Sequence, residues 1–401
     1  MTILVFNSGS SSLKFQLFDI ADKNSLQSLV RGKVSALGAQ ARCVWNVAGA
    51  DHSASRAIHN HQQAAEWVIS CLQDLDFARS IIAIGHRIVH GGDEFSAPVR
   101  LTDAVIDSIE SLSLLAPLHN PLALQVIRAT QTFFGEALPQ VAVFDTAFFH
   151  SLPDQARYYA LPDQWTRDYG IKRYGFHGIA HRAMCERFHE IPNVPWQSKH
   201  QSSRIITVQL GQGCSIAAIQ DGVPVETSMG FTPLEGLIMG TRPGDVDAGV
   251  LLHLMTRMSS DALSAGLYQQ AGLLGLSGVS ADMAELLALQ AQNHSGATRA
   301  ITAFCHRVRK YIGSYLAVLG GADAIIFGGG ISENSPALCA RMCANMAWCG
   351  LEVNKVNNSV DPLPSNSELR LSTPNSKIAV YIIPVNEELL IAQDIISVSS
   401  E

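Results

Sequence analysis

The sequence predicts an α/β protein of two domains, and three observations support this class. The chain has 401 residues, more than the ~100–200 residues of a typical domain. Short β-rich runs alternate with segments whose apolar residues recur at helical spacing, which is typical of α/β folds. A strand, a glycine-containing turn and a second strand also occur in the same order in both halves of the chain.

Five runs are expected to be buried strands whose ends carry functional loops. They are residues 3–7 (ILVFN), 81–86 (IIAIGH), 141–145 (VAVFD), 205–211 (IITVQLG) and 324–330 (AIIFGGG). Helices are indicated where apolar residues recur every three or four positions. Such residues are Ala65, Val68, Ile69 and Leu72, and later Ile301, Phe304, Cys305 and Val308.

The repeated hairpin reads LVFN-SGSSS-LKFQLFD near residue 5 and TVQL-GQGCS-IAAIQDG near residue 208. If each domain carries one hairpin and both face a shared cleft, together they can grip the phosphates of a nucleotide. Turn chemistry shared by chance is the alternative, because Gly, Ser and Asn dominate turns generally.

We expect a domain boundary near residues 148–153. It separates residues 1–149, completed by a C-terminal helix at 386–401, from residues 150–385.

Composition excludes several classes of function. The net charge of -7, from 28 basic and 35 acidic residues, provides no basic surface for nucleic acid or an anionic membrane. No run approaches the ~20 apolar residues of a membrane span, and the start MTILVF lacks a signal peptide's basic region. We expect a cytoplasmic protein without nucleic-acid or membrane partners. The eight cysteines include no CxxC pair and are interpreted as reduced core residues rather than a zinc site.

Two segments in the first half suit anion binding. In NSGSSSLKF, the backbone N–H groups of the turn and the cation of Lys14 can cradle phosphate oxygens. The GxxxxGK[ST] spacing of a Walker loop is absent. In GHRIVHGG, Arg87 at a strand end can bind a carboxylate or phosphate bidentately, or it can form a structural ion pair.

Three further charged residues allow two interpretations each. Asp145 directly follows a strand, where it can position a metal, water or nucleophile, although by itself a helix cap is the favoured interpretation. Arg242 lies in a turn dense in Gly and Pro, and a buried arginine there needs an anion from the protein or from a ligand. Glu387 falls in the first turn of an expected helix, where it can simply complement the helix dipole. The polar stretch 192–204 is expected to be a surface loop.

The order and spacing of seven segments resemble those of the acetate kinase family, within the group of actin-like, sugar-kinase and heat-shock ATPase folds. From residue 3 to about 396 they are NSGSSSLKF, GHRIVHGG, LAPLHNP, FDTAFF, RYGFHG, TSMGFTPLEGLIMGTRPGD and IPVNEELLIA. The resemblance implies two actin-like (ribonuclease H-like) domains with an internal duplication and a cleft between them. It also implies a homodimer that binds acetate and acetyl phosphate.

The implied reaction is the reversible, Mg2+-dependent transfer of the γ-phosphoryl group of ATP to acetate, giving acetyl phosphate and ADP, with Mn2+ as a substitute metal. The resemblance implies that Asn7 and Glu387 help to hold the metal. The implied catalytic residues are Asp145, Arg87, His177 and Arg242. The implied substrate-binding residues are Arg87, Val89, Leu118, His119, Phe176 and Pro233. The implied nucleotide-binding residues are Ser10, Ser12, Lys14, Gln209, Leu210, Gly211, Gln212, Gly213, Asp282, Met283, Ala284, Gly330, Ile331, Ser332, Glu333 and Asn334.

The chemistry agrees with these residue types. Carboxylic acids titrate near pH ~4, so acetate is already ionised and needs no general base. The site must instead hold two anions in line and neutralise their charge. Two arginines, a histidine and Mg2+ meet that need, because phosphoryl transfer depends on positioning and charge. Asp145 is then interpreted as an orienting or metal-shell carboxylate rather than a base.

The nucleotide segments depart from the family pattern. The usual HLGNGAS is QLGQGCS here, the usual DMR or DFR becomes DMA, and GGIGEN becomes GGISEN. The hypothesis is weaker ATP binding or a different phosphoryl donor. Substrate length depends on Val89, since propionate-preferring relatives have a smaller alanine there, which would enlarge the pocket. One methylene group changes the discrimination between two substrates by only ~1–3 kcal/mol. Acetate is favoured. The alternatives are a propionate kinase, or a catalytically impaired binding or regulatory relative.

Overall fold

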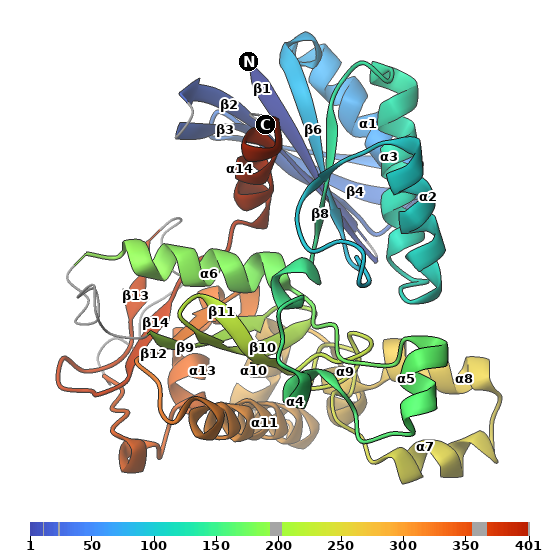
Figure 1. Cartoon of the computed structure of the whole chain (residues 1–401). Helices are drawn as coiled ribbons and strands as arrows, with labels where there is room; N and C mark the ends of the chain where they lie inside the picture. The colour runs from blue at the N-terminus through green and yellow to red at the C-terminus, as the bar shows by residue number, and fades with distance from the viewer. Residues whose placement is uncertain (11, 23–24, 193–202, 355–366, 400–401) are drawn as a thin grey trace. The chain divides into compact units, whose positions relative to one another are not determined.

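The computed structural model describes residues 1–10, 12–22, 25–192, 203–354 and 367–399 (Figure 1). It contains two compact units, one formed by Met1–His150 with Asn386–Glu401 and the other by Ser151–Val385. The loop expected at 192–204 falls mainly outside the described residues. No helix in the described part of the chain is long and apolar enough to cross a membrane.

The first unit is built on an eight-stranded sheet with the order β5-β4-β3-β2-β1-β6-β8-β7. Strands β1, β6 and β8 run parallel, whereas β1 to β5 form a chain of antiparallel pairs and β7 is antiparallel to β8. The carboxyl ends of β1, β6 and β8 therefore meet at one edge. The strands are β1 (Thr2–Gly9), β2 (Ser12–Asp22), β3 (Ser25–Ser35), β4 (Gly38–Val47), β5 (Ala50–Ile58), β6 (Ile81–Ile88), β7 (Val99–Arg100) and β8 (Gln140–Phe144).

Helices cover both faces of this sheet (Figure 1). They are α1 (His61–Asp74), α2 (Asp103–Ser111), α3 (Asn120–Phe134) and α14 (Glu387–Ser399). Ile84 packs in a buried cluster with Val68 of α1 and Val126 of α3. Its neighbour Gly85 faces α14, because a Cβ there would come within 2.5 Å of Ile395. Close packing on Gly85 thus brings the start of α14 to the edge where β1 and β6 end.

The second unit is built on a six-stranded sheet with the order β11-β10-β9-β12-β14-β13. Its strands are β9 (Arg204–Leu210), β10 (Cys214–Gln220), β11 (Val223–Thr227), β12 (Ala324–Gly328), β13 (Leu369–Arg370) and β14 (Ala379–Ile382). Figure 1 shows α6 on one face of the sheet and α11 on the other. The helices are α4 (Asp154–Arg157), α5 (Asp163–Tyr169), α6 (Gly178–Glu190), α7 (Ala248–Met255), α8 (Ser260–Ala265), α9 (Gly272–Ser277), α10 (Met283–Ala291), α11 (Ser295–Leu319), α12 (Gly330–Asn334) and α13 (Pro336–Met342).

The two sheets share one arrangement of five strands. In the first, β3-β2-β1 form an antiparallel meander, and β6 and β8 continue the sheet parallel to β1. In the second, β11-β10-β9 and then β12 and β14 repeat that order and those directions. The predicted α/β class and internal duplication are therefore confirmed. The five strands expected from the sequence correspond to β1, β6, β8, β9 and β12.

Candidate active site

A cluster of charged and amide side chains lies at the carboxyl edge of the first sheet. Asn7 on β1 pairs in register with Arg87 on β6, and Asp145 follows β8 directly. Glu387 and Glu388 come from the first turn of α14, which Asn386 caps by accepting a hydrogen bond from the Leu389 N–H at 3.0 Å. Sheet order and the packing of α14 on Gly85 bring residues from four distant segments together.

Arg87 is held on two sides. Its Nε lies 3.1 Å from both carboxylate oxygens of Asp145, and its Nη2 donates to the same carboxylate. Its Nη1 donates to Asn7 Oδ1 at 2.9 Å. The Asn7 amide in turn donates to Glu387 Oε2 at 2.7 Å and to Glu388 Oε1 at 2.8 Å. These hydrogen bonds form one continuous network.

The network has more carboxyl groups than cations, since three carboxyl groups surround one guanidinium. Burial by itself would lower the pKa of Arg87, but the charges of Asp145, Glu387 and Glu388 outweigh burial and raise it. Arg87 is therefore always protonated. Mg2+ commonly takes one or two protein carboxylates and completes its shell with phosphate and water. Within the described residues no group of three or more acidic, His or Cys side chains is arranged to hold a metal ion, so the network offers part of such a shell at most.

Three sequence interpretations can be judged at this cluster. The interpretation of Asp145 as a helix cap is wrong: Thr146 occupies that position before the turn Ala147–Phe149, and Asp145 pairs with Arg87 instead. Arg87 forms the structural ion pair that was one of its two alternatives. Glu387 lies in the first helical turn, as expected, but it also binds Asn7. Glu388 was not predicted, and its only signal was its position beside Glu387.

A second cluster lies in the other unit, around the β9–β10 turn. His177 has a left-handed conformation (φ 58°) at the start of α6, and its Nδ1 lies 2.8 Å from the Ser215 hydroxyl on β10. The same hydroxyl lies 2.8 Å from Nε2 of buried His181, whose Nδ1 lies 2.7 Å from Thr207 Oγ1. This chain of contacts holds the imidazole of His177 in one orientation.

Arg242 lies beside His177. Its Nη1 donates to the Pro233 carbonyl at 2.7 Å, and within the described residues no carboxylate pairs with it. Burial lowers the pKa of Arg242 because the guanidinium loses hydration that no nearby carboxylate replaces. Sequence reasoning required an anion for a buried arginine in this turn, and the described part of the chain does not supply one.

Gly213 separates these two side chains, and replacing it with alanine is expected to lower kcat by about 10- to 100-fold. A Cβ on Gly213 would lie 2.7 Å from Arg242 Nη2 and 3.1 Å from His177 Nε2, so both groups must move. Steady-state kinetics and thermal unfolding would measure the effect. Gly313→Ala in the same unit is the control, because a Cβ there would meet no other atom within 4 Å. Equal losses in both variants would contradict this interpretation.

The expected pocket-wall residues are divided between the two units. Val89 and Phe176 are buried, whereas Leu118 is 44% exposed. His119 immediately precedes α3 in the first unit, and Pro233 contacts Arg242 in the second.

The expected nucleotide residues lie on four structural elements. Ser10, Ser12 and Lys14 belong to the β1–β2 hairpin, and residues 209–213 to the end of β9 and its turn. Residues 330–334 form α12, and Asp282 caps α10 by accepting from the Glu285 N–H at 3.0 Å. Met283 and Ala284 open α10. Two of the residues that depart from the family pattern, Gln209 and Ser332, each keep a buried polar atom, Oε1 and Oγ, without a partner among the described residues.

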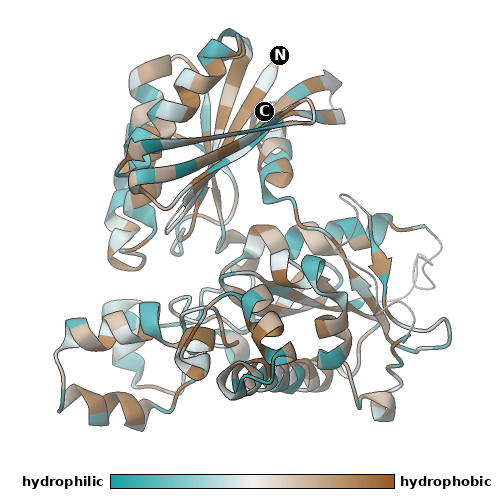
Figure 2. Ribbon diagram, turned by 180° about the vertical axis from the view of Figure 1, so that it is seen from behind, coloured by the Kyte–Doolittle hydropathy of each residue, from teal (hydrophilic) through white to brown (hydrophobic). Residues whose placement is uncertain are grey.

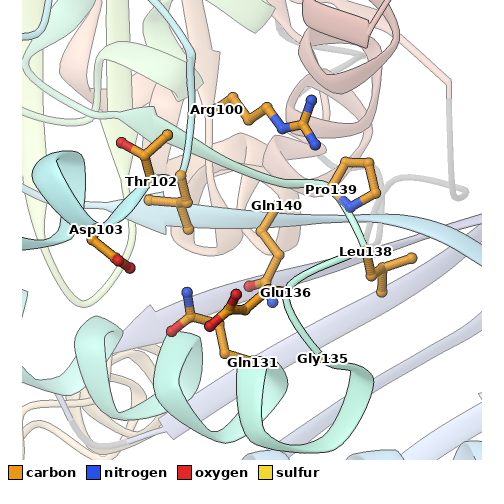
Figure 3. Close-up of a pocket in the computed structure, with 10 residues that line it drawn as sticks. Arg100, Thr102, Asp103, Gln131, Gly135, Glu136, Leu138, Pro139 and Gln140 are labelled. Carbon is orange, nitrogen blue, oxygen red and sulfur yellow. The ribbon is translucent and has the colours of Figure 1, made fainter.

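A pocket of about 460 Å³ lies elsewhere, between β7, the end of α3 and the loop before β8 (Figure 3). Arg100, Asp103 and Glu136 are among the residues that line it, and none of the expected site residues does. This pocket is therefore separate from both clusters.

The fold, with its duplicated α/β architecture, is that of a kinase. A sequence model of the acetokinase family matches residues 2–393, and the chain belongs to this family. It is 42% identical to an acetate kinase of Chloroherpeton thalassium over 414 residues, covering 98% of both chains. The crystal structure of Porphyromonas gingivalis acetate kinase is similar, with a TM-score of 0.88, 37% identity and 99% of both chains covered. A propionate kinase from Francisella tularensis also gives a TM-score of 0.88, at 36% identity and 98% coverage of both chains.

Proposed function

We propose that this protein is an acetate kinase that reversibly transfers the γ-phosphoryl group of ATP to acetate. The observation that carries the proposal is Arg242, a half-buried cation whose guanidinium lacks a carboxylate partner among the described residues and lies beside His177. Such a group stabilises negative charge on a transferring phosphoryl group. An acetate oxygen attacks the γ-phosphorus, the bond to the bridging oxygen breaks, and ADP leaves with that electron pair, so no proton transfer is needed.

The roles of the individual residues are part of this proposal. Arg87 binds the carboxylate and the transferring phosphate, and Asp145 orients its guanidinium through the bidentate contact. Arg242 and His177 stabilise the transition state. Asn7 and Glu387 are the groups that would hold Mg2+, directly or through water, and Mn2+ would replace it in the same oxygen ligands. When bound, the metal supplies charge neutralisation at the phosphates.

A hydroxamate assay for acyl phosphate tests the reaction. Acetate, propionate and butyrate would each be combined with ATP, GTP and pyrophosphate in the presence of Mg2+. We expect the highest turnover with acetate and ATP. Activity only with another donor would support the alternative that Gln209, Gln212, Ala284 and Ser332 have changed donor choice. No turnover with any pair would reject the kinase proposal in favour of a binding or regulatory relative.

Val89→Ala is expected to raise the ratio of kcat/KM for propionate to that for acetate by about tenfold, because a smaller wall admits one more methylene. Val89 is buried directly after β6. Ile88→Val is the matched control, since Ile88 belongs to a buried cluster on α3 and β8. A ratio that changes equally in both variants, or in neither, would remove Val89 from the specificity pocket.

We also propose a homodimer, supported by an apolar surface on the second unit. Helix α7 buries none of its residues, and Figure 2 shows it as strongly hydrophobic. A contiguous patch of exposed apolar side chains on a protein surface often marks a protein–protein interface. The exposed apolar residues on and beside α7 are Val246, Val250, Leu252, Met255 and Met258.

Leu252→Glu is expected to convert the dimer to a monomer, because it places a charge in that apolar surface. Sedimentation velocity would measure the mass at micromolar concentration. Leu114→Glu is the control, since Leu114 is 90% exposed in the other unit. A wild-type monomer, or a Leu252→Glu dimer, would refute this interface.

The two compact units support the proposed domain arrangement, with an N-terminal domain of residues 1–149, completed by the C-terminal helix, and a second domain of residues 150–385. We further propose a cytoplasmic location without nucleic-acid partners, which the net charge of -7 supports.

A further inference from the structure

His61 is a buried histidine that the proposed reaction does not use. It is 2% exposed and is the first residue of α1. The start of this helix is fixed on both sides, because Asn60 Oδ1 accepts from the Gln63 N–H at 2.9 Å and Gln63 Oε1 accepts from the His59 N–H at 2.8 Å. The backbone that carries the imidazole is therefore held in place before any ligand binds.

The imidazole contacts the β1–β2 hairpin near its tip. His61 Nε2 lies 2.8 Å from the carbonyl oxygen of Gly9, the last residue of β1, and Gly9 pairs across the hairpin with Ser12. A carbonyl oxygen only accepts, so Nε2 carries the proton and donates. Burial lowers the pKa of His61 and keeps the ring neutral, while hydrogen bonds to the backbone of Gly9 and Ser12 act in the opposite direction.

A turn that binds phosphate must present N–H groups to the ligand and direct its carbonyl oxygens elsewhere, because a carbonyl oxygen repels a phosphate oxygen. The hydrogen bond from His61 directs the Gly9 carbonyl toward α1. Ser10, next in the chain, is exposed at the tip. The imidazole therefore contacts the hairpin through the Gly9 carbonyl, on the side of the hairpin that faces α1.

We infer that His61 is a positioning residue for nucleotide binding. It holds the Gly9 carbonyl away from the nucleotide phosphates. This inference rests on the proposed function, in which the hairpin of Ser10, Ser12 and Lys14 contacts the phosphates. His61 itself touches neither substrate nor metal. Its removal should therefore weaken nucleotide binding more than it slows the chemical step.

Two substitutions test the hydrogen bond itself. His61→Leu removes the donor and retains an apolar side chain, whereas His61→Gln places an amide N–H at a reach similar to that of Nε2. We expect His61→Leu to raise KM for ATP by about tenfold, with acetate KM and kcat changed less than threefold, and His61→Gln to restore most of the ATP affinity. Leu72→Ala, a fully buried position on the same helix, is the control for general destabilisation.

Two measurements separate this inference from the proposed reaction. Calorimetric titration with ADP and Mg2+ reports affinity without turnover, and amide hydrogen exchange over β1 and β2 reports the order of the hairpin without any ligand. We expect faster exchange at the hairpin in His61→Leu but not in His61→Gln or Leu72→Ala. Failure of wild-type turnover would reject the kinase reaction alone. Unchanged ADP affinity and exchange in His61→Leu, or equal changes in Leu72→Ala, would overturn the role of His61.

Discussion

Arg242→Met is expected to lower kcat by about 10³-fold while leaving the free energy of unfolding unchanged or slightly higher. The large kinetic effect follows because one arginine aimed at a transferring phosphoryl group contributes a factor of about 10³–10⁵. The unchanged stability follows because, within the described residues, Arg242 has no carboxylate partner whose charge its removal would strand. Loss of activity without loss of stability is the signature of a ligand-binding cation.

Arg173→Met is the matched control for this prediction. Arg173 is another half-buried arginine of the same unit, but it pairs with Glu235 at 2.7 Å and with Glu226 at 3.8 Å. Its removal strands those carboxylates and should cost about 3–5 kcal/mol. Urea unfolding and steady-state kinetics on both variants give the comparison. If Arg242→Met loses as much stability as Arg173→Met, Arg242 is a structural residue and the proposed catalytic role fails.

Asp145→Leu is expected to abolish measurable turnover and to lower the free energy of unfolding by about 3–5 kcal/mol. Asp145 is fully buried and both of its oxygens contact Arg87, so the substitution leaves a guanidinium without its closest counter-charge. The stability loss and the kinetic loss have different causes. Stability depends on the ion pair, whereas turnover depends on the orientation of Arg87.

The double variant Arg87→Met with Asp145→Leu separates these causes. Removing both charges should recover most of the stability, because an apolar pair of similar volume replaces a buried ion pair. Activity should remain absent. Urea unfolding of both single variants and of the double variant measures the coupling. An additive loss in the double variant would show that the ion pair is not the source of the stability effect.

Much of the secondary structure was predictable because it depends on local patterns. Apolar runs ended by glycine or by polar residues predicted β6, β8 and β12, and spacing of three and four residues predicted α1 and α11. The same local chemistry identified the two hairpins as copies of one unit. Arg242 was also predicted to need an anion, since the rule for buried charges requires no knowledge of neighbours.

Partnership between distant side chains was not predictable in the same way. Considered by itself, Asp145 favoured a cap because a cap is local, whereas its partner Arg87 is 58 residues away in the chain. Glu388 joined the cluster only because α14 packs on Gly85. His177 contacts Ser215 because α6 lies against β9 and β12, next to β10. In each case the strand order, or the packing of a helix on the sheet, decided which side chains meet.

The sequence alone determined the α/β class and the duplication, because propensity, periodicity and turn chemistry are properties of short segments. It also predicted the residue types of a site for two anions. Only the tertiary structure decided that Arg173 is paired with carboxylates and that Arg242 is not, among the described residues. The two arginines look alike in sequence. They differ in whether a carboxylate lies next to the guanidinium, and that depends on packing in three dimensions.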